Sequence, residues 1–434
     1  MRVPYIVGRW VRGENHYGRE RLIDHLLHTP DSAIWLVGTR RMGKTSLLRQ
    51  LELLTGGAES RHVPIFWDLQ GCESSQGLSD ELFFSLEDAA DRFAQHKIDV
   101  STFAGQDALL ILRSLARTLS EQDKQLLVLI DEAEVLIDLA RLEPAWVARL
   151  RRTLQDGRLR TIITATKLLA QLHYVSSRWM TSPFLFGFSL VNLGKLDDSA
   201  ARALVRQLQA DRPVRATDGV VDDILIHTNG QPYLVQYLCQ RLFQTDSAGN
   251  GYLRPVEDAD LAADHILAGF FRIDFEHLTR IERRLLLTVA DLTIARESEL
   301  LALLSDLSPH RIRMFLYGLG RLGYLRQIFG QWAVGNEFLR RWVVDHYDEL
   351  MGQLDSALDD QLQEALLEVG HSAEVRYLRE EISRLEAELA QVEAALGQAT
   401  GAERDALLAQ LDRLRAELAR LRNDLDSIAP DSGS

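Results

Sequence analysis

The segment GTRRMGKTS, residues 38–46, places glycines, basic side chains and hydroxyls between an apolar run and a leucine-rich stretch. It fits the spacing G-x-x-x-x-G-K-[ST] through Gly38, Gly43, Lys44 and Thr45. Glycines at these positions let backbone N–H groups surround phosphate oxygens, and the lysine reaches the β- and γ-phosphates. The spacing predicts a phosphate-binding loop with Thr45 as a Mg²⁺ ligand. The other residues of this loop are Thr39, Arg40, Arg41, Met42 and Ser46.

A strand and a helix are expected on the two sides of this loop. Residues 34–37 are bulky and apolar, as in a strand buried on both faces, and residues 45–54 have helical periodicity. Helical segments separate the further strands expected at 63–69, within 125–136, at 161–166 and at 184–193. This alternation predicts an α/β fold with a parallel sheet, which places ligands at the carboxyl ends of its strands.

Two carboxylates follow the apolar run LLVLI, at residues 131 and 132. A carboxylate at the end of a buried strand can orient the Mg²⁺ shell, and one beside it can polarise the water that attacks a γ-phosphate. We therefore expect Asp131 to hold the metal and Glu132 to activate water. The phosphate-binding loop and this acidic pair support each other as parts of one site.

Length, charge and cysteine content limit the possible classes. A chain of 434 residues fits roughly two to four domains. Residues 348–434 carry −12 of the formal charge of −14, so the nearly neutral remainder gives no general attraction to nucleic acid or anionic lipid. No apolar run has the length of a signal peptide or a membrane span, which predicts a cytoplasmic protein without membrane contact. Cys72 and Cys239 suggest buried thiols instead of a zinc site or a disulfide framework.

The pattern beyond Leu193 is helical. Amphipathic helices are expected at 196–209, 218–228 and 230–243. Residues 274–345 contain three helical segments followed by a small hairpin around Gly330, which predicts a winged helix of nearly neutral charge.

Leucine, isoleucine or valine recurs at alternating spacings of four and three between 378 and 396, and leucine does so again between 407 and 425. This spacing is typical of a coiled coil. The two halves are out of phase, and Thr400 with Glu403 forms a capping box that would start a new helix. We therefore expect an antiparallel helical hairpin; the alternative is one continuous helix that dimerises.

These patterns divide the chain into six predicted parts. They are a P-loop α/β core at 1–195, a helical lid at 196–272, a winged helix at 273–347, an acidic helical linker at 348–372, a coiled-coil hairpin at 373–427 and a disordered tail at 428–434.

Residues 1 to about 345 resemble the STAND branch of the AAA+-related P-loop ATPases. The resemblance depends on the order and spacing of five elements. They are HYGRE (16–20), GTRRMGKTSLL (38–48), LLVLIDEAE (126–134), TIITATK (161–167) and NGQPYLVQYLC (229–239). It implies an ATPase that uses ATP and Mg²⁺, with a helical lid and a winged helix after the core.

The resemblance also implies site residues outside the loop. Gly18 and Arg19 match the element that borders the adenine, and Gly230 and Pro232 match the lid turn that faces the nucleotide. Thr166 matches the polar sensor at the end of its strand, with Thr164 as an alternative because either side chain could face the phosphate.

Arg40 and Arg41 could contact phosphate, point to solvent or pack on a neighbouring domain, because backbone amides carry the function of such a loop. Two features depart from the family pattern. The sequence contains no clear arginine finger and no methionine-histidine-aspartate triplet in the winged helix.

Three functions compete at this point. The leading hypothesis is an ATP-dependent switch that hydrolyses slowly and binds a protein partner, or itself, through residues 373–427. The second is a DNA-associated ATPase that resembles archaeal replication initiators and reads DNA with Arg311, Arg313 and Arg321. The near-neutral charge of the winged helix disfavours it. The third is a coiled-coil scaffold in which nucleotide is only structural.

Overall fold

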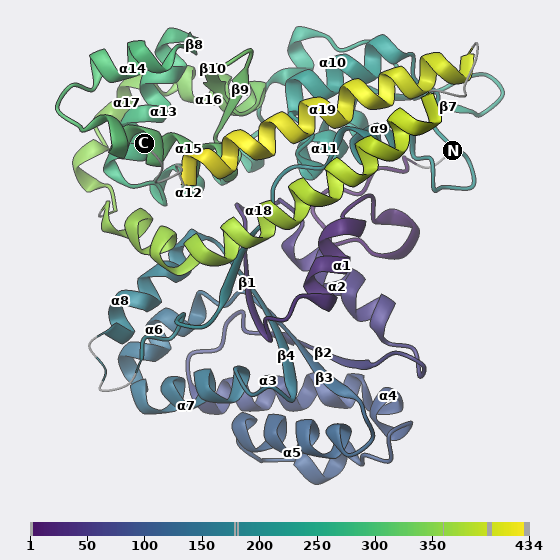
Figure 1. The fold of residues 1–434 in the computed structure, drawn as a ribbon, viewed down its shortest axis with the longest axis vertical. Helices are drawn as coiled ribbons and strands as arrows, with labels where there is room; N and C mark the ends of the chain where they lie inside the picture. Colours follow the sequence, from purple (N-terminus) through teal and green to yellow (C-terminus); the bar gives the residue numbers. More distant parts are fainter. Residues whose placement is uncertain (1–2, 178, 180–181, 359, 397–401, 429–434) are drawn as a thin grey trace.

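The computed structural model describes residues 3–177, 179, 182–358, 360–396 and 402–428 (Figure 1). A five-stranded parallel sheet has the order β2-β3-β4-β1-β5. Its strands are β1 (Ala33–Val37), β2 (His62–Asp68), β3 (Gln125–Asp131), β4 (Leu159–Ala165) and β5 (Ser189–Asn192). The predicted parallel α/β sheet is therefore confirmed.

The fifth strand is shorter than predicted. The sequence pattern indicated residues 184–193, but residues 183–188 form turns, with Phe186 N–H donating to the Pro183 carbonyl and Phe188 N–H donating to that of Leu185. Gly187 has φ of 90°, which extended backbone does not allow. An apolar run alone does not distinguish these turns from strand.

Helices cover both faces of the sheet, because successive side chains of a strand point to opposite sides. Ile34 and Leu36 pack with α1 and α2, whereas Trp35 and Val37 belong to the larger apolar core on the other face. The helices of the core are α1 (Glu20–His28), α2 (Lys44–Thr55), α3 (Ser75–Asp88), α4 (Ala90–Ala94), α5 (Ala108–Ser120), α6 (Val135–Leu142), α7 (Pro144–Leu154) and α8 (Gln171–Ser177).

A largely helical unit follows β5. It contains α9 (Asp198–Arg206), α10 (Asp218–Thr228), α11 (Pro232–Leu242), the small hairpin of β6 (Phe243–Thr245) and β7 (Gly251–Leu253), and α12 (His265–Glu276). Of the two cysteines, Cys239 in α11 is buried, but Cys72 is only partly buried, so the expectation for Cys72 was wrong.

The next unit combines helices with a three-stranded antiparallel sheet of order β8-β10-β9. The predicted three helices and hairpin are present, and Phe329 and Gly330 form the turn with φ of 48° and 78°. Its elements are α13 (Arg280–Leu292), β8 (Ile294–Ala295), α14 (Glu297–Leu303), α15 (Pro309–Arg321), β9 (Leu325–Ile328), β10 (Gln331–Val334), α16 (Glu337–Asp345) and α17 (Tyr347–Met351).

The last two helices, α18 (Gln361–Leu396) and α19 (Ala402–Ile428), form an antiparallel pair (Figure 1). The ion pairs Arg415–Glu393 and Arg422–Glu386 fix this direction. The chain therefore forms the expected hairpin and not a continuous rod. Helix α18 crosses the predicted boundary at residue 372, and Thr400 of the predicted capping box and residues 429–434 of the predicted tail lie outside the described residues.

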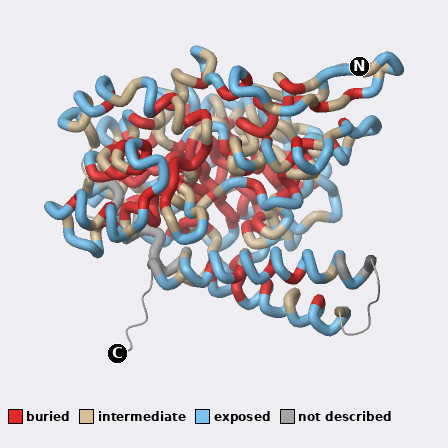
Figure 2. Tube along the Cα trace, turned by 90° about the horizontal axis from the view of Figure 1, so that it is seen from above, coloured by how far each residue is buried: buried red, intermediate tan, exposed pale blue. Residues whose placement is uncertain are grey.

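The hairpin has an apolar seam of its own and lies along the outside of the main body (Figure 2). Arg384 pairs with Asp24 of α1 at 2.8 Å, and Arg321 of α15 pairs with Asp424 of α19 at 3.3 Å. The hairpin thus contacts both the α/β core and the unit of residues 280–351. No helix within the described ranges is long and apolar enough to cross a bilayer.

A buried ion pair joins the α/β core to α13. Lys167 follows β4, and its ammonium group meets the Glu282 carboxylate, with only 4% and 0% of the two side chains exposed. Replacing Lys167 by methionine should lower the free energy of unfolding by about 3–5 kcal/mol, because Glu282 then stays buried without its counter-charge. Urea unfolding followed by tryptophan fluorescence measures this loss.

The control is the double variant Lys167→Met/Glu282→Gln, which removes both charges and keeps an acceptor for the Thr279 N–H. It should recover most of the lost stability. A double variant as unstable as the single one would show that the charges of this pair are not the cause.

Candidate functional site

The predicted phosphate-binding loop connects the end of β1 to the start of α2. Gly43 precedes the helix with φ of 96°, a conformation that favours glycine. A Cβ on Gly38 would lie 3.3 Å from the carbonyl oxygen of Leu193, so the loop packs closely on the chain leaving β5. The positive end of α2 opens at this loop, which is a general arrangement for anion binding.

The Lys44 side chain lies folded over its own loop. It is buried, and its ammonium group donates to the carbonyl oxygens of Gly38 at 3.0 Å and Thr39 at 3.2 Å. Both of these acceptors are neutral backbone groups of the loop. The ammonium group is therefore already held at the loop, where a phosphate would need it.

Two hydroxyls converge on the carboxylate at the end of β3. Thr45 donates to one oxygen of Asp131 at 2.6 Å, and Thr164 donates to the other. Asp131 is 2% exposed. The pair of Thr45 and Asp131 offers the oxygen ligands that Mg²⁺ prefers, so the residues present fit this metal.

Two glutamates follow Asp131. Glu132 has φ of 53° and is exposed at the surface. Loss of hydration through the protein atoms around its carboxyl raises the pKa of this group, and the negative charges of Glu134 and Asp131 raise it further. Lys44 and Arg40 act in the opposite direction. Glu134 accepts a hydrogen bond from the Thr166 N–H. The sequence analysis gave Glu134 no role, although it lies in the same acidic run.

The two candidate threonines have different positions, Thr164 within β4 and Thr166 just after it. The Thr164 hydroxyl contacts Asp131, whereas the Thr166 hydroxyl accepts from the Leu168 N–H and caps a 3-10 turn, Lys167–Ala170. Thr166 also lines a small cavity beside Thr39 of the loop. Thr164 thus lies against the Asp131 carboxylate, whereas Thr166 lies beside the loop at Thr39.

Gly18 and Arg19, expected to border the adenine, and Gly230, expected with Pro232 to face the nucleotide, lie near the segment between β5 and α9. Gly18 has φ of 71°, and a Cβ there would lie 2.5 Å from that of Ala200. Gly230 has φ of 66° and packs against the Leu196 carbonyl. Arg19 donates to the carbonyls of Gly194 and Lys195, and Pro232 is the first residue of α11. None of the four contacts the loop directly through a described hydrogen bond.

Several loop side chains face other parts of the chain. The Arg41 guanidinium lies over the rings of Phe270 and Tyr233, at 4.3 Å and 5.4 Å from their centroids. Arg41 therefore packs on the neighbouring helical unit, which is one of the three positions expected for this side chain. The Ser46 hydroxyl accepts from the Val11 N–H, so it faces the N-terminal segment.

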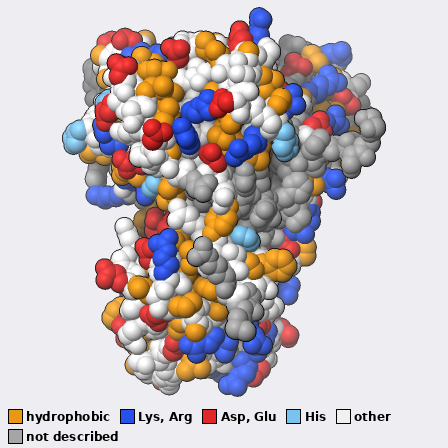
Figure 3. Space-filling model, turned by 90° about the vertical axis from the view of Figure 1, so that its left-hand side faces the viewer, with side chains coloured by type: hydrophobic (Ala, Val, Ile, Leu, Met, Phe, Trp, Pro, Cys, Tyr) orange, Lys and Arg blue, Asp and Glu red, His pale blue; other side chains and the backbone are white. Residues whose placement is uncertain are grey.

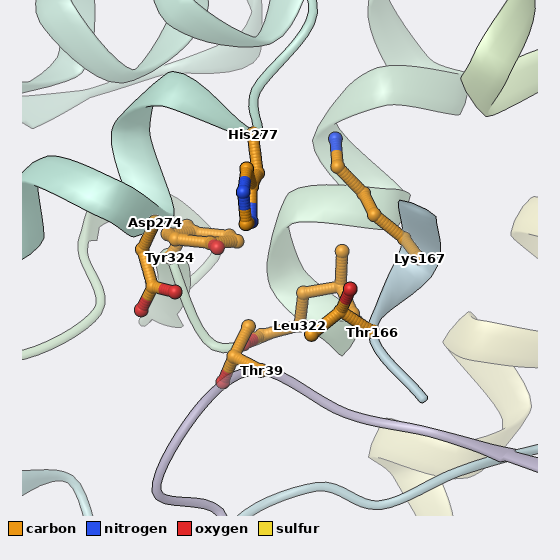
Figure 4. Close-up of a pocket in the computed structure, with 7 residues that line it drawn as sticks. All are labelled: Thr39, Thr166, Lys167, Asp274, His277, Leu322 and Tyr324. Carbon is orange, nitrogen blue, oxygen red and sulfur yellow. The ribbon is translucent and has the colours of Figure 1, made fainter. Parts of the chain in front are cut away.

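The turn between α15 and β9 also reaches the loop. The Thr39 hydroxyl lies 3.5 Å from the Leu322 carbonyl oxygen, and the Met42 methyl group lies 3.6 Å from where a Cβ of Gly323 would be. A cavity of about 10 Å³, room for about one water molecule, lies between these elements (Figure 4). Its lining consists of Thr39, Thr166, Lys167, Asp274, His277, Leu322 and Tyr324.

The family model of the AAA domain matches residues 27–172, which contain the loop, the acidic pair and both threonines. This part of the chain is therefore similar to an AAA domain, and its sheet and loop have the fold of a P-loop ATPase. No curated protein matches the chain.

Among solved structures, a Walker-type ATPase of Pyrococcus abyssi aligns with 78% of this chain and 99% of its own, at 16% identity and a TM-score of 0.54. An ORC2 protein of Aeropyrum pernix aligns at 13% identity, with coverage of 78% and 95% and a TM-score of 0.44. The Cdc6p protein of Pyrobaculum aerophilum aligns at 14% identity, with coverage of 81% and 96% and a TM-score of 0.36. The first of these likenesses shows a shared fold.

The raised pKa of Glu132 in the AAA-type domain has a consequence for stability. The folded protein holds the proton of this carboxyl more tightly than the unfolded chain, so ionised Glu132 destabilises the fold above its raised pKa. Glu132→Gln should raise the thermal midpoint at pH 8. The gain should disappear as pH falls toward about 4.3, the ordinary glutamate pKa.

Calorimetric scans of both proteins between pH 4 and pH 8 test this expectation. Glu121→Gln, which removes an exposed carboxylate outside the site, is the control for the loss of one surface charge. A gain for Glu132→Gln that is the same at every pH would contradict the assigned cause.

Proposed function

We propose that this protein is an ATP-dependent molecular switch of the STAND type, which binds ATP with Mg²⁺ and hydrolyses it slowly. One observation carries the proposal. Three separate parts of the chain contact the phosphate-binding loop: α11 and α12 through Arg41, and the α15–β9 turn through Thr39 and Met42. A ligand at this loop would therefore affect the contacts of both units that follow the α/β core.

In this proposal the residues 196–272 act as the helical lid, and residues 273–347 are a winged helix. To move such an arrangement from mostly closed to mostly open, ATP must bind the open form better by about 5.5 kcal/mol. The loop contacts named above supply sites at which this difference can arise.

The side chains divide the chemical work. A phosphate would replace the neutral carbonyl acceptors of Lys44 with a charged one, which gives a stronger hydrogen bond. Thr45 and Asp131 would hold Mg²⁺, which neutralises charge on the phosphate oxygens. Glu132 would take the proton of the attacking water, and its raised pKa makes the carboxylate a better proton acceptor than an ordinary one.

The helical hairpin is the proposed output. It contacts the core through α1 and the winged helix through α15, so a change in their relative position must break one set of contacts. The exposed Arg384–Asp24 pair contributes only about 0.2–1 kcal/mol, so this contact alone adds little to the free energy that holds the hairpin in place. Residues 373–427 would then be available to a protein partner or to a second copy of the chain.

Nothing specific favours the DNA-associated alternative. Arg313 pairs with Glu297, Arg321 pairs with Asp424, and α19 lies against α15. On the face drawn in Figure 3, basic and acidic side chains are interspersed over the upper half. Two of the three arginines of the expected recognition helix are thus paired with carboxylates, and α19 contacts this helix.

ATP binding and phosphate release by the intact protein test the proposed site. Lys44→Ala should abolish ATP binding, because the loop loses its phosphate partner. Glu132→Gln should retain ATP binding and lose at least about 100-fold in turnover. Lys124→Ala is the matched control, because Lys124 also donates to backbone carbonyls but lies away from the loop.

Unchanged ATP affinity in Lys44→Ala would remove the loop from its assigned role. Normal turnover in Glu132→Gln would place the water-activating group elsewhere. Phosphate release strongly stimulated by double-stranded DNA would favour the DNA-associated function over the switch.

The docking of the hairpin is tested by exchanging the charges of one ion pair. Arg384→Glu places like charges beside Asp24 and should undock α18 more often, raising hydrogen exchange in α1 about two- to fivefold. Asp24→Arg/Arg384→Glu restores the pair with reversed charges and should restore protection. Equal exchange in all three proteins would show that this contact does not hold the hairpin in place.

A further inference from the structure

The end of α12 carries a carboxylate that faces the phosphate-binding loop. Asp274, His277 and Tyr324 form one side of the small cavity, and Thr39, Thr166 and Lys167 form the other (Figure 4). The two sides come from different units of the chain. Asp274 is thus the acidic group that the lid and the winged helix present to the loop across this cavity.

The polar groups around this cavity are not fully paired. The Asp274 carboxylate lines this cavity, and the Arg40 Nη1 atom is buried without a hydrogen-bond partner among the described residues. Lys167 is already paired with Glu282. Arg40 and Lys44 therefore remain as the loop cations that can attract an anion in this place.

The electrostatics agree with this geometry. Burial raises the pKa of Asp274 to about 7, and the charges of Arg40 and Lys44 act in the opposite direction. Burial and the charges of Arg40 and Lys167 lower the pKa of His277 to about 4, so this imidazole is neutral at physiological pH. The positive charges of Arg40 and Lys44 thus favour the ionised form of Asp274, whereas the neutral imidazole of His277 provides no counter-charge for this carboxylate.

The cavity borders the loop at Thr39, on the side that faces the other units, where we expect the terminal phosphate of a bound nucleotide. Loop amides enclose the α- and β-phosphates, and the loop lysine reaches the β- and γ-phosphates. The terminal phosphate is consequently the group that faces other elements. Thr39 of the loop and Thr166 at the end of β4 both line the cavity, as expected for the surroundings of that phosphate.

We propose that the Asp274 carboxylate competes with the γ-phosphate of ATP for Arg40 and Lys44, and thereby sets the preference of the site between nucleoside diphosphates and triphosphates. The inference rests on the proposed nucleotide-binding function. A diphosphate leaves the place of Asp274 free, whereas a triphosphate brings a second anion there. Like charges in one partly buried site repel, so a bound γ-phosphate drives α12 away from the loop.

Movement of α12 would reach the other contacts of the loop. Phe270, one of the two rings under Arg41, belongs to the same helix, and α13 with Glu282 follows it directly. Displacement of Asp274 thus acts on the cation–π contact and on the buried Lys167–Glu282 pair. One carboxylate links the nucleotide state to the position of two units.

The test compares Asp274→Asn with Glu276→Gln, which neutralises an exposed carboxylate two residues further along. The dissociation constants of ADP and of a non-hydrolysable ATP analogue are measured with Mg²⁺ on the full chain. In Asp274→Asn, the preference for the triphosphate over the diphosphate should rise at least about tenfold. Glu276→Gln should leave it unchanged, and thermal scans verify that both variants are folded. Asp274→Ser replaces Asp274→Asn if the latter does not fold.

Three outcomes are decisive. A selective gain for the triphosphate supports the inference. Affinities for both nucleotides that stay constant, or that change by the same factor, overturn it while leaving the nucleotide site in place. A wild-type protein that binds neither nucleotide overturns the proposed function and this inference together.

Discussion

The hydrogen bond from Thr45 to Asp131 depends on the parallel sheet more than on either residue. Thr45 is in the first turn of α2, which follows β1, and Asp131 ends β3. In the sheet, β1 and β3 are separated by β4. Only strands that run in the same direction bring these ends to one edge. Thr164 of the intervening β4 donates to the same carboxylate, so three consecutive strands of the sheet converge on one buried anion.

This convergence positions the part of the site that the α/β core provides. The other part comes from segments that lie much later in the sequence. Helix α12 and the α15–β9 turn cover the loop, and the buried Lys167–Glu282 pair sets their position. The loop is therefore both the ligand site and part of the interface between units. Because the same residues of the loop would contact the ligand and the neighbouring units, binding of a ligand there would also alter the contacts between units.

The local parts of this arrangement could be predicted from the sequence. Bulky apolar runs gave all five strands, and the glycine spacing gave the loop, because each depends on neighbouring residues only. The choice between Thr164 and Thr166 could not be made, since residues two apart on one strand point the same way. Asp274, His277 and Tyr324 belong to no local motif and reach the cavity only through tertiary packing. The position of the hairpin against the core could not be predicted from the sequence either, because exposed ion pairs such as Arg384–Asp24 leave no periodic pattern.

The interface around the loop combines two kinds of ionic contact with different consequences. In the buried Lys167–Glu282 pair, the attraction is largely offset by the loss of hydration, so separating both ions into water costs far less than leaving one of them buried. A closed arrangement in which these two groups do not meet is therefore strongly disfavoured, but full opening is not. The exposed pairs of the hairpin add only small increments to this balance. An interface of this type is specific when closed and costs little free energy to open, as the proposed nucleotide-dependent switch requires.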